Sequence, residues 1–519
     1  MMDTSPDWHH MKQRITLGIA GALAATLALA GCSAGQSVDI DGSGGSSGQT
    51  LVAAIGGEPD QLDPQKTTSY FAFEVLENVY DTLVQPDENL EMQPALAESW
   101  TTSDDQLTWT FTLRDGVKFQ DGSDFTSEDV VYSYRRIIDE KLANAWKFST
   151  VTDVTAPDDA TVVITVSQPT PNLLSNLGGF KGMAIVEKSN VESGEITTAP
   201  VGTGPFSVSD YVAGDHITLT ANPDYWGGAP QLGGVEYRFI SEPATALASL
   251  KAGDIDWTDV VPPQRVEQLK SDSSVTLGQT PSSDYWYLAL NEAKAPWNDV
   301  RVRQAIAYAI DRDAIVQAVS YGTAEVNQLA IPKQSVWYTE YDQYSTDLDK
   351  AKSLLAEAGY TGGTLDLLAT SDYPETVTAA QIIAAELEPL GIQVSIRQPD
   401  FSTWLDEQNS GNFDMLMMGW LGNIDPDDFY YSQHHTDGAS NAQKFSDAEV
   451  DRLLDAGRVE TDTAARKDLY AQAATIIADK ASYIYLYNPS VLQLYSPKVS
   501  GYDTRADRAI RFAGVSLSE

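Results

Sequence analysis

The side chains that most often catalyse reactions or bind metals are sparse in this sequence, which has five histidines and one cysteine. His434 and His435 are neighbours, so on a regular helix or strand their side chains point apart. We therefore expect no metal site, with His434 as a weak candidate ligand. Asp427 and Asp428 form a carboxylate pair of the kind that general acid–base catalysis uses. Because acidic residues are abundant throughout the chain, a solvated loop is the better interpretation of this pair.

Sequence motifs indicate no enzyme family. The chain has no phosphate-binding Gly-x-x-x-x-Gly-Lys-[Ser/Thr] loop and no His-Glu-x-x-His zinc motif. Gly202-Thr-Gly-Pro205 is too short for a dinucleotide fingerprint, and no helical pattern follows it. We expect a protein that is not an enzyme and that has no cofactor.

Aromatic side chains are the more informative group. Five of them occur on or beside strands expected in the second half of the chain: Trp286, Tyr287, Phe401, Trp404 and Trp420. Each one alone fits a hydrophobic core equally well. Several aromatics near strand ends, without a catalytic set, predict a pocket that binds by stacking and apolar contact.

The expected elements bring these aromatics onto one part of the fold. Residues 285–291 predict a strand. Strand 364–369, helix 374–390 and strand 392–398 predict a β-α-β unit with a parallel pair. Helix 402–409 and strand 413–420 repeat this pattern, so Trp404 and Trp420 follow each other on consecutive elements.

Elsewhere the local patterns are also regular. Residues 107–113 alternate apolar and polar side chains, which predicts a half-buried strand. Thr126 and Asp129 have the spacing of a helix N-terminus, and Gly359 that of a helix C-terminus. Helical spacing of apolar residues is present from Phe71 to Val84.

The N-terminal segment indicates export. Lys12 and Arg14 precede an apolar run from Ile15 to Ala30, and small residues follow, in the order of a secretory signal peptide. This run is shorter than a membrane-spanning helix requires. Residues 1–10 do not fit a signal peptide, so we place the true start of translation at Met11.

The single cysteine ends this segment. Leu29-Ala-Gly-Cys32 resembles the lipobox of bacterial lipoproteins, which implies that Cys32 is lipidated and becomes the N-terminus after removal of residues 1–31. Residues 32–49 then form a flexible Gly/Ser-rich linker. No thiol remains for a disulfide or a cysteine-based metal site.

Composition limits the partners. Apolar residues make up 42% of the chain, as in ordinary globular proteins, and the length predicts two or three domains. The formal net charge of −41 disfavours nucleic acid, because phosphate contacts require Lys and Arg. Anionic lipid would also repel this surface, so we expect the membrane attachment to be the covalent anchor.

From about residue 50 to its end the chain resembles the extracytoplasmic solute-binding proteins of ABC importers, in the oligopeptide/dipeptide/nickel-binding family, family 5. The stretches that carry the resemblance are 96–100, 113–122, 128–130, Gly202–Phe206, Asn222–Trp226, Asn298–Asp313 and Asp349–Gly359. The resemblance implies an α/β fold of the type II periplasmic-binding-protein kind, with two lobes on a hinge and an extra domain. It also implies a monomer that delivers a solute to a membrane permease.

Three domains follow from this resemblance, and the sequence pattern itself changes near residues 200 and 281. Domain I would be discontinuous, domain II would be the extra domain, and domain III would be the opposing lobe. The expected ranges are 50–84, 200–280 and 488–519 for domain I, 85–199 for domain II and 281–487 for domain III.

The resemblance also implies the ligand-binding residues. Thr68, Ser69 and Tyr70 match the domain I side of the cleft, and Trp286, Tyr287, Phe401, Trp404 and Trp420 are the domain III candidates. In peptide-binding members an Asp shortly after the equivalent of Trp420 pairs with the free amine of the peptide. Asn423 occupies that place here, and an amide lacks the charge that an ammonium group prefers. Asp425 is the alternative partner, or the ligand has no free amine.

Three functions stay open at this point. The first is a lipid-anchored binding protein that captures peptides for an ABC importer. The second keeps this transport role for a metal chelate or an oligosaccharide, with His434 as the residue to test for a chelate. The third is a receptor or sensor lipoprotein that uses the same fold.

Overall fold

The computed structural model describes residues 48–180 and 182–518, all within one compact unit, Ser46–Glu519. The expected signal peptide (1–31), Cys32 and the linker up to residue 47 lie outside the described residues. In the part of the chain that is described, no helix has the length and apolar character needed to cross a membrane.

A seven-stranded sheet contains strands from both ends of the described chain, in the order β12-β19-β11-β1-β10-β9-β8. β1 pairs in parallel with β10 and β11, and its alternating residues Leu51, Ala53 and Ile55 are fully buried. The strand bounds are β1 Thr50–Ile55, β8 Phe206–Val212, β9 His216–Ala221, β10 Gly234–Phe239, β11 Trp257–Thr258, β12 Thr276–Pro281 and β19 Ser490–Tyr495. Its helices are α1 Tyr70–Leu76, α5 Pro243–Ala252, η3 Pro263–Arg265 and α6 Val266–Leu269.

A four-stranded antiparallel sheet, β4-β5-β7-β6, has its own hydrophobic core. Trp109, Phe111 and Leu113 alternate into this core, which confirms the strand expected at 107–113. The strands are β4 Ala97–Thr102, β5 Thr108–Leu113, β6 Val151–Asp158 and β7 Thr161–Val166, beside the hairpin β2 Val84–Pro86 and β3 Met92–Pro94. The helices are α2 Ser127–Asp139, η1 Ala145–Phe148, α3 Leu173–Gly178, α4 Lys188–Ser193 and η2 Glu195–Thr197.

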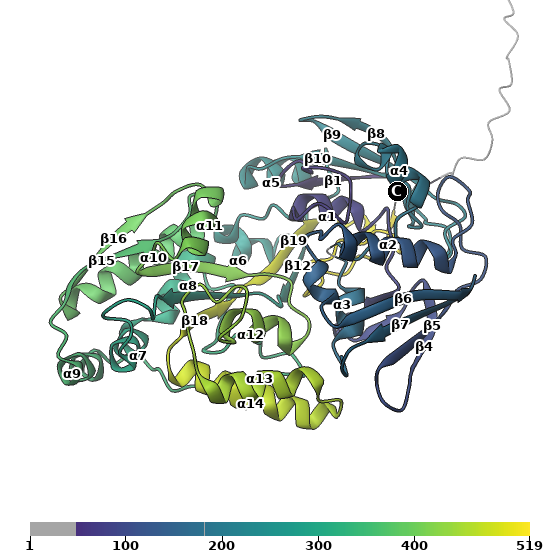
Figure 1. Cartoon of the computed structure of the whole chain (residues 1–519). Helices are drawn as coiled ribbons and strands as arrows, with labels where there is room; N and C mark the ends of the chain where they lie inside the picture. The colour runs from purple at the N-terminus through teal and green to yellow at the C-terminus, as the bar shows by residue number, and fades with distance from the viewer. Residues whose placement is uncertain (1–47, 181, 519) are drawn as a thin grey trace, which may run out of the picture. The chain divides into compact units, whose positions relative to one another are not determined.

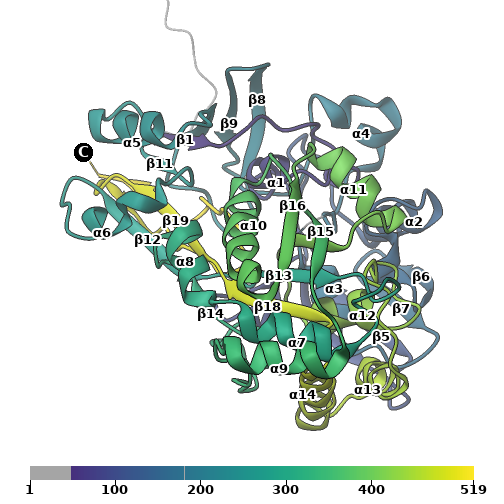
Figure 2. The same ribbon diagram turned by 90° about the vertical axis from the view of Figure 1, so that its left-hand side faces the viewer.

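A six-stranded sheet has the order β14-β18-β13-β17-β15-β16 (Figures 1 and 2). Its strands contain Trp286, Tyr287 and Trp420, and the helix α11 contains Phe401 and Trp404. β15 pairs in parallel with β16 and β17, which confirms the expected β-α-β units. The strands are β13 Tyr285–Leu290, β14 Glu325–Val326, β15 Gly363–Leu368, β16 Ile392–Arg397, β17 Met415–Trp420 and β18 Tyr483–Asn488. The helices are α7 Val300–Ala309, α8 Arg312–Ser320, α9 Leu348–Ala358, α10 Pro374–Leu387, η4 Glu388–Leu390, α11 Phe401–Ser410, α12 Pro426–His434, α13 Ala448–Val459 and α14 Thr463–Asp479.

The chain crosses between the seven-stranded and six-stranded sheets at two neighbouring places. The first crossing is between β12 and β13. The second is at Pro489, between β18 and β19, and the Ser282 N–H donates to the Pro489 carbonyl at 2.9 Å. We call the seven-stranded and four-stranded sheets with their helices the first lobe, and the six-stranded sheet with its helices the second lobe. After β19 the chain stays in the first lobe, where β20 (Val499–Ser500) pairs with β21 (Ser516–Leu517).

Candidate functional site

One pocket of about 150 Å³ lies on the second lobe, and all five candidate aromatics line it. We call it the aromatic pocket, and its lining residues are Trp286, Tyr287, Tyr373, Phe401, Trp404, Leu405, Gln408, Met418, Gly419, Trp420 and Leu421. The structure therefore brings together residues from β13, α11 and β17, of which Trp286 and Trp420 are 134 positions apart in the sequence. Because the walls are chiefly aromatic and aliphatic, the pocket suits an apolar or aromatic group.

Local sequence explains how these rings reach one pocket. The Asp400 side chain caps α11 by accepting from the Thr403 N–H at 3.0 Å, and the helix places Phe401, Trp404 and Leu405 on one face. The Phe401 and Trp404 rings stack with centroids 5.7 Å apart. On the sheet, Trp286 faces Gly419 across the β13–β17 pair, and the missing side chain leaves room for the indole.

Three apolar side chains at the pocket remain accessible to solvent. Phe401 is 37% exposed, and Leu405 and Leu421 are each 41% exposed. Large apolar side chains that gather in one exposed place mark a binding surface more often than a structural one. The rim of the aromatic pocket is therefore available to a ligand.

The candidates Thr68, Ser69 and Tyr70 lie at the start of α1 in the first lobe, outside the lining of the aromatic pocket. Thr68 is exposed, and Ser69 is the N-terminal cap residue of the helix. The Tyr70 hydroxyl donates to the Arg508 carbonyl at 3.2 Å. Of these three residues, Tyr70 contacts Arg508, and Arg508 in turn contacts the second lobe.

Arg508 and Asp284 join the lobes. Arg508 Nε lies 2.6 Å from Oδ2 of Asp284, which is fully buried just before β13. Burial lowers the pKa of Arg508, but Asp284, Tyr70 and Asp259 together raise it, so the net shift of this pKa is upward. Gly422, in the left-handed conformation (φ 69°), donates its N–H to Asp284 Oδ1 at 2.6 Å. Polar contacts thus link Tyr70 to the turn after Trp420 through two residues that the sequence analysis did not identify.

Asn423 and Asp425 have structural partners in this turn. Asn423 is 2% exposed, and its amide donates to the carbonyls of Ser283 and Trp420 at 3.4 Å each. Both Asp425 oxygens accept from the Arg466 guanidinium, at 2.6 and 2.7 Å, and Asp425 also caps α12. The structure therefore places neither side chain in the lining of the aromatic pocket.

His434 lies in the core of the second lobe. It is fully buried, and its Nε2 is 2.9 Å from the Tyr485 hydroxyl. Burial lowers the pKa of His434 to about 3, so the imidazole is neutral at physiological pH. Among the described residues no group of three or more His, Cys, Asp or Glu side chains could hold a metal ion. His434 therefore lies in the hydrophobic core of the second lobe.

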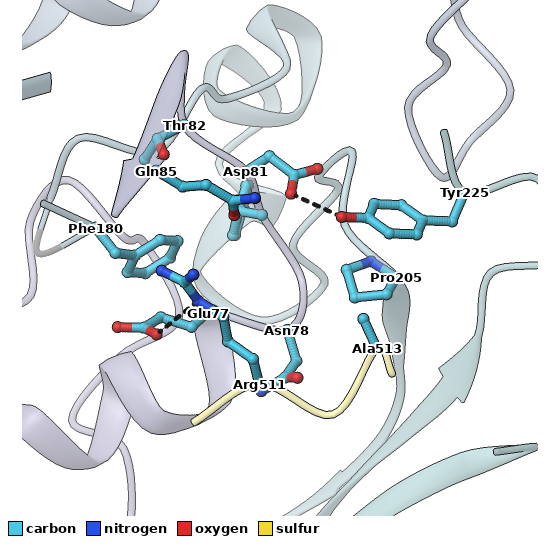
Figure 3. A pocket seen from close by; sticks show the side chains of 11 residues that line it. Glu77, Asn78, Asp81, Thr82, Gln85, Phe180, Pro205, Tyr225, Arg511 and Ala513 are labelled. Carbon is cyan, nitrogen blue, oxygen red and sulfur yellow. Dashed lines mark hydrogen bonds and ion pairs between the residues drawn. The ribbon is translucent and has the colours of Figure 1, made fainter. Parts of the chain in front are cut away.

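Two further cavities have charged side chains in their walls. The inner cavity, of about 170 Å³, is within the first lobe and contains Glu77, Asp81, Gln85, Tyr225 and Arg511 (Figure 3). Burial raises the pKa of Asp81, although the Trp226, Thr203 and Tyr225 side chains donate hydrogen bonds to its carboxylate and oppose this shift.

The interlobe cavity, of about 30 Å³, has walls from both lobes. Lys147, Phe180 and Arg511 come from the first lobe, and Gly422, Ile424 and Asp428 come from the second. Burial raises the pKa of Asp428, and the charge of Lys147 opposes this rise. The interlobe cavity and the inner cavity share Glu77, Phe180 and Arg511 as lining residues.

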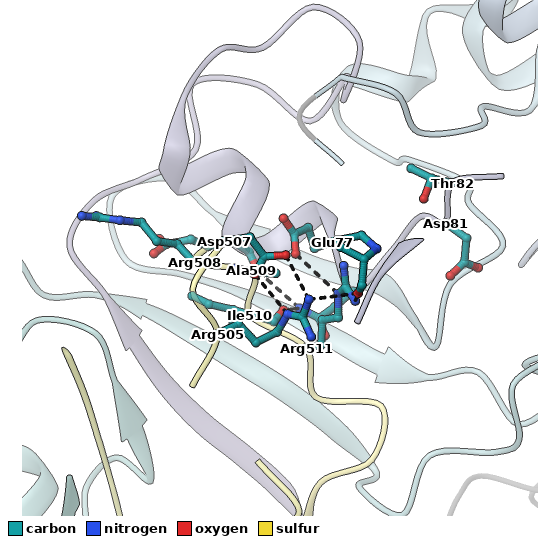
Figure 4. A network of polar contacts seen from close by, with 12 residues as sticks. Glu77, Asp81, Thr82, Arg505, Asp507, Arg508, Ala509, Ile510 and Arg511 are labelled. Atoms are coloured by element: carbon teal, nitrogen blue, oxygen red, sulfur yellow. Dashed lines mark hydrogen bonds and ion pairs between the residues drawn. The ribbon is translucent and has the colours of Figure 1, made fainter. Parts of the chain in front are cut away.

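The C-terminal segment after β19 supplies positively charged side chains near these cavities, and the sequence did not indicate this role. Arg505, Arg508 and Arg511 recur at intervals of three (Figure 4). Arg505 is paired with Asp507. Burial raises the pKa of Asp507, but Arg505 and Arg511 lower it, and the net shift is downward. The regular spacing of arginines was the available signal, but only the fold shows that this segment returns to the first lobe beside the cavities.

Comparisons with known proteins show which proteins the chain is similar to. The model of the family described as "Bacterial extracellular solute-binding proteins, family 5 Middle" matches residues 91–441. Heme-binding protein A of Haemophilus influenzae is 31% identical over 98% of this chain and 100% of its own length. The probable D,D-dipeptide-binding periplasmic protein DdpA of Escherichia coli is 30% identical over 87% of this chain and 91% of its own length.

A solved structure gives the same result in three dimensions. It is the ABC transporter-associated periplasmic binding protein DppA from Helicobacter pylori, in complex with the peptide STSA. The TM-score is 0.80 at 30% identity, and the match covers 91% of this chain and 98% of that chain.

Proposed function

Since the chain belongs to family 5 of the bacterial extracellular solute-binding proteins, we propose that it captures peptides between its two lobes and delivers them to the permease of an ABC importer. Its fold is that of the type II periplasmic binding proteins, and its role is to bind a substrate rather than to transform it. We further propose that it acts outside the cytoplasmic membrane as a monomer, attached through a lipidated Cys32.

The aromatic pocket carries this proposal. Trp286, Phe401, Trp404 and Trp420 surround it, and its exposed rim offers apolar area that a peptide side chain would cover. Covering apolar surface contributes roughly 25 cal/mol per Å², so one aliphatic or aromatic side chain provides a few kcal/mol of binding energy. The two crossings between the lobes are short, and they are hydrogen-bonded to each other at Ser282 and Pro489. The lobes would close about this connection, and a bound ligand would select the closed arrangement.

Thermal unfolding with a tripeptide library tests the proposal. The full chain carrying Cys32→Ser should unfold at a higher temperature when the library is added, since a ligand that binds the native state stabilises it. Leu405→Ala should reduce the shift, because Leu405 lines the rim. Val336→Ala, at a residue 61% exposed and outside the pocket, is the matched control. No shift with any tripeptide would contradict peptide capture.

The turn after Trp420 favours a second candidate function, in which the same receptor binds a solute without a free amine. Asn423 is held by backbone carbonyls, and Asp425 is neutralised by Arg466, so neither offers a carboxylate to an ammonium group. N-acetylated tripeptides distinguish the two cases. A shift as large as that of the unmodified library would show that the amine is not recognised.

A further inference from the structure

The helix α11 contributes two adjacent rows of side chains to the aromatic pocket. Phe401 and Leu405, four positions apart, form one row, and both are exposed. Trp404 and Gln408, also four positions apart, form the other row, and they are only 2% and 7% exposed. All four side chains line the pocket. The exposed row therefore lies at the rim, and the row of Trp404 and Gln408, which we call the inner row, lies at the buried side.

The inner row contains polar groups that the protein does not use. Within the described residues the Gln408 side-chain amide makes no hydrogen bond. The Trp404 indole N–H is buried there without an acceptor as well. Nearly all buried polar groups in folded proteins have a partner, because a buried group without one costs free energy. Since Gln408 lines the pocket, a ligand in the pocket can supply the partner that the protein lacks.

Other polar side chains at α11 are engaged outside the pocket. Asp400 accepts from the Thr403 N–H at 3.0 Å, and Glu407 pairs with Arg397. None of these residues lines the pocket. Of the α11 side chains that do, Gln408 alone is hydrophilic. Gln408 is therefore the residue of this helix that can give the pocket a preference for a polar group.

The chemistry of the lining narrows the kind of side chain that fits. No charged residue is among the described residues that line the pocket, so an ammonium, guanidinium or carboxylate group would be buried there without a counter-charge. The aromatic walls suit a ring. A glutamine amide both donates and accepts hydrogen bonds, and so does a phenolic hydroxyl, whereas an indole N–H only donates. Tyrosine combines the ring with the hydroxyl.

We propose that Gln408 makes the aromatic pocket selective for a tyrosine side chain of the bound peptide, with the ring between the aromatic walls and the hydroxyl on the Gln408 amide. This rests on the proposed function and names the side chain that the pocket accepts. A phenylalanine side chain would cover the same apolar walls but would leave the amide buried without a partner. The preference for Tyr over Phe therefore separates the contribution of Gln408 from that of the walls.

Isothermal titration calorimetry with two sets of tripeptides tests this on the full chain carrying Cys32→Ser, freed of bound solute by unfolding and refolding. One set has a single Tyr among Ala residues, at the first, second or third position, and the other set has Phe at the same positions. The tightest Tyr tripeptide should bind about tenfold more tightly than its Phe counterpart, because only the hydroxyl satisfies the buried amide. Gln408→Leu should bind the Phe tripeptide at least as tightly as the Tyr tripeptide.

Controls separate this proposal from the proposed function. Gln472→Leu makes the same change at an exposed glutamine of α14 outside the pocket and should keep the preference for Tyr. Gln408→Met also removes the amide and replaces Gln408→Leu if that variant does not fold.

A purely structural role of Gln408 would change the affinities for both sets by one factor. An unchanged preference for Tyr in Gln408→Leu would therefore overturn the proposal. Equal binding of both sets by the wild-type side chains would overturn it too, and peptide capture would stand. Binding of neither set would overturn the proposed function as well.

Discussion

At the scale of single residues, Asp425 shows that a carboxylate beside a candidate pocket can have a structural partner. Its partner Arg466 is buried, and the guanidinium lies 5.3 and 5.1 Å from the ring centroids of Trp337 and Tyr470. Burial lowers the pKa of Arg466, but the charge and hydrogen bonds of Asp425, together with Tyr470 and Asp427, give a net upward shift of this pKa. The pair therefore joins α12 to α14 inside the second lobe.

Asp425→Asn tests this structural role. The substitution retains a cap for α12 but leaves the Arg466 charge buried without its partner, so we expect the free energy of unfolding to fall by about 3 kcal/mol. Urea unfolding measures the loss. Glu449→Gln, which breaks an exposed pair with Arg452, should cost less than about 1 kcal/mol. An equally small cost for Asp425→Asn would contradict the structural role.

His434 makes stability depend on pH. The folded protein has a His434 pKa of about 3 because the imidazole is buried, whereas an unfolded histidine has a pKa near 6.5. Between these values the unfolded state binds more protons, so the His434 contribution to stability is lost as pH falls below about 6.5.

We expect acidification from pH 7 to pH 5 to reduce the free energy of unfolding by about 2 kcal/mol more in the wild type than in His434→Gln. Urea unfolding of both proteins at the two pH values gives this difference. Other titrating groups are common to both proteins and cancel. Identical pH dependence would show that His434 is not buried as a neutral group.

At the scale of elements, the aromatic pocket depends on the close approach of β13 and β17. A Cβ atom added at Gly419 would lie 2.9 Å from two atoms of the Trp286 ring. Gly419→Ala should therefore displace the indole, lower the free energy of unfolding by about 1–3 kcal/mol and weaken binding of the tripeptide library. Gly514→Ala is the control, since an added Cβ there has its nearest neighbour at 3.9 Å. Unchanged affinity in Gly419→Ala would argue against the pocket as the binding site.

The sequence predicted those elements whose signals are local. The capping box of Thr126 and Asp129 and the left-handed Gly359 at the end of α9 are present in the structure. The parallel pairing of β15 with β16 was also predictable, because strand, helix and strand follow one another directly. Helical spacing from Phe71 to Val84 was misleading after Leu76, where α1 ends. Val79, Tyr80 and Leu83 are buried by the surrounding fold rather than by continuation of the helix.

Only part of the candidate site could be predicted from the sequence. The aromatic residues were identifiable, because their type and their position near strands indicate a pocket. Asp284, Arg508 and Arg511 were not identifiable. Arg508 meets Asp284, and Arg511 reaches the inner cavity, only because β19 returns the chain to the first lobe. Asp425 has the type expected of an amine-binding residue, but its neutralisation by Arg466, 41 residues later, depends on tertiary packing. The division into three domains stays a prediction.

At the scale of the whole molecule, the two lobes meet at short crossings and share polar contacts. Ser282, Asp284 and Pro489 lie at these crossings, and Asp284 also binds Arg508 and the Gly422 N–H. A cavity with walls from both lobes follows directly from this arrangement. We therefore expect a solute to be enclosed between the lobes, and we expect it to be a peptide.

Native mass spectrometry of the full chain carrying Cys32→Ser, purified from cells grown in rich medium, tests this claim most directly. We expect a bound population whose extra masses form a ladder with steps of amino-acid residues. The ladder should disappear after the protein is unfolded and refolded without peptide. A single discrete extra mass, or steps of a hexose, would contradict peptide capture and would assign the aromatic pocket to another solute.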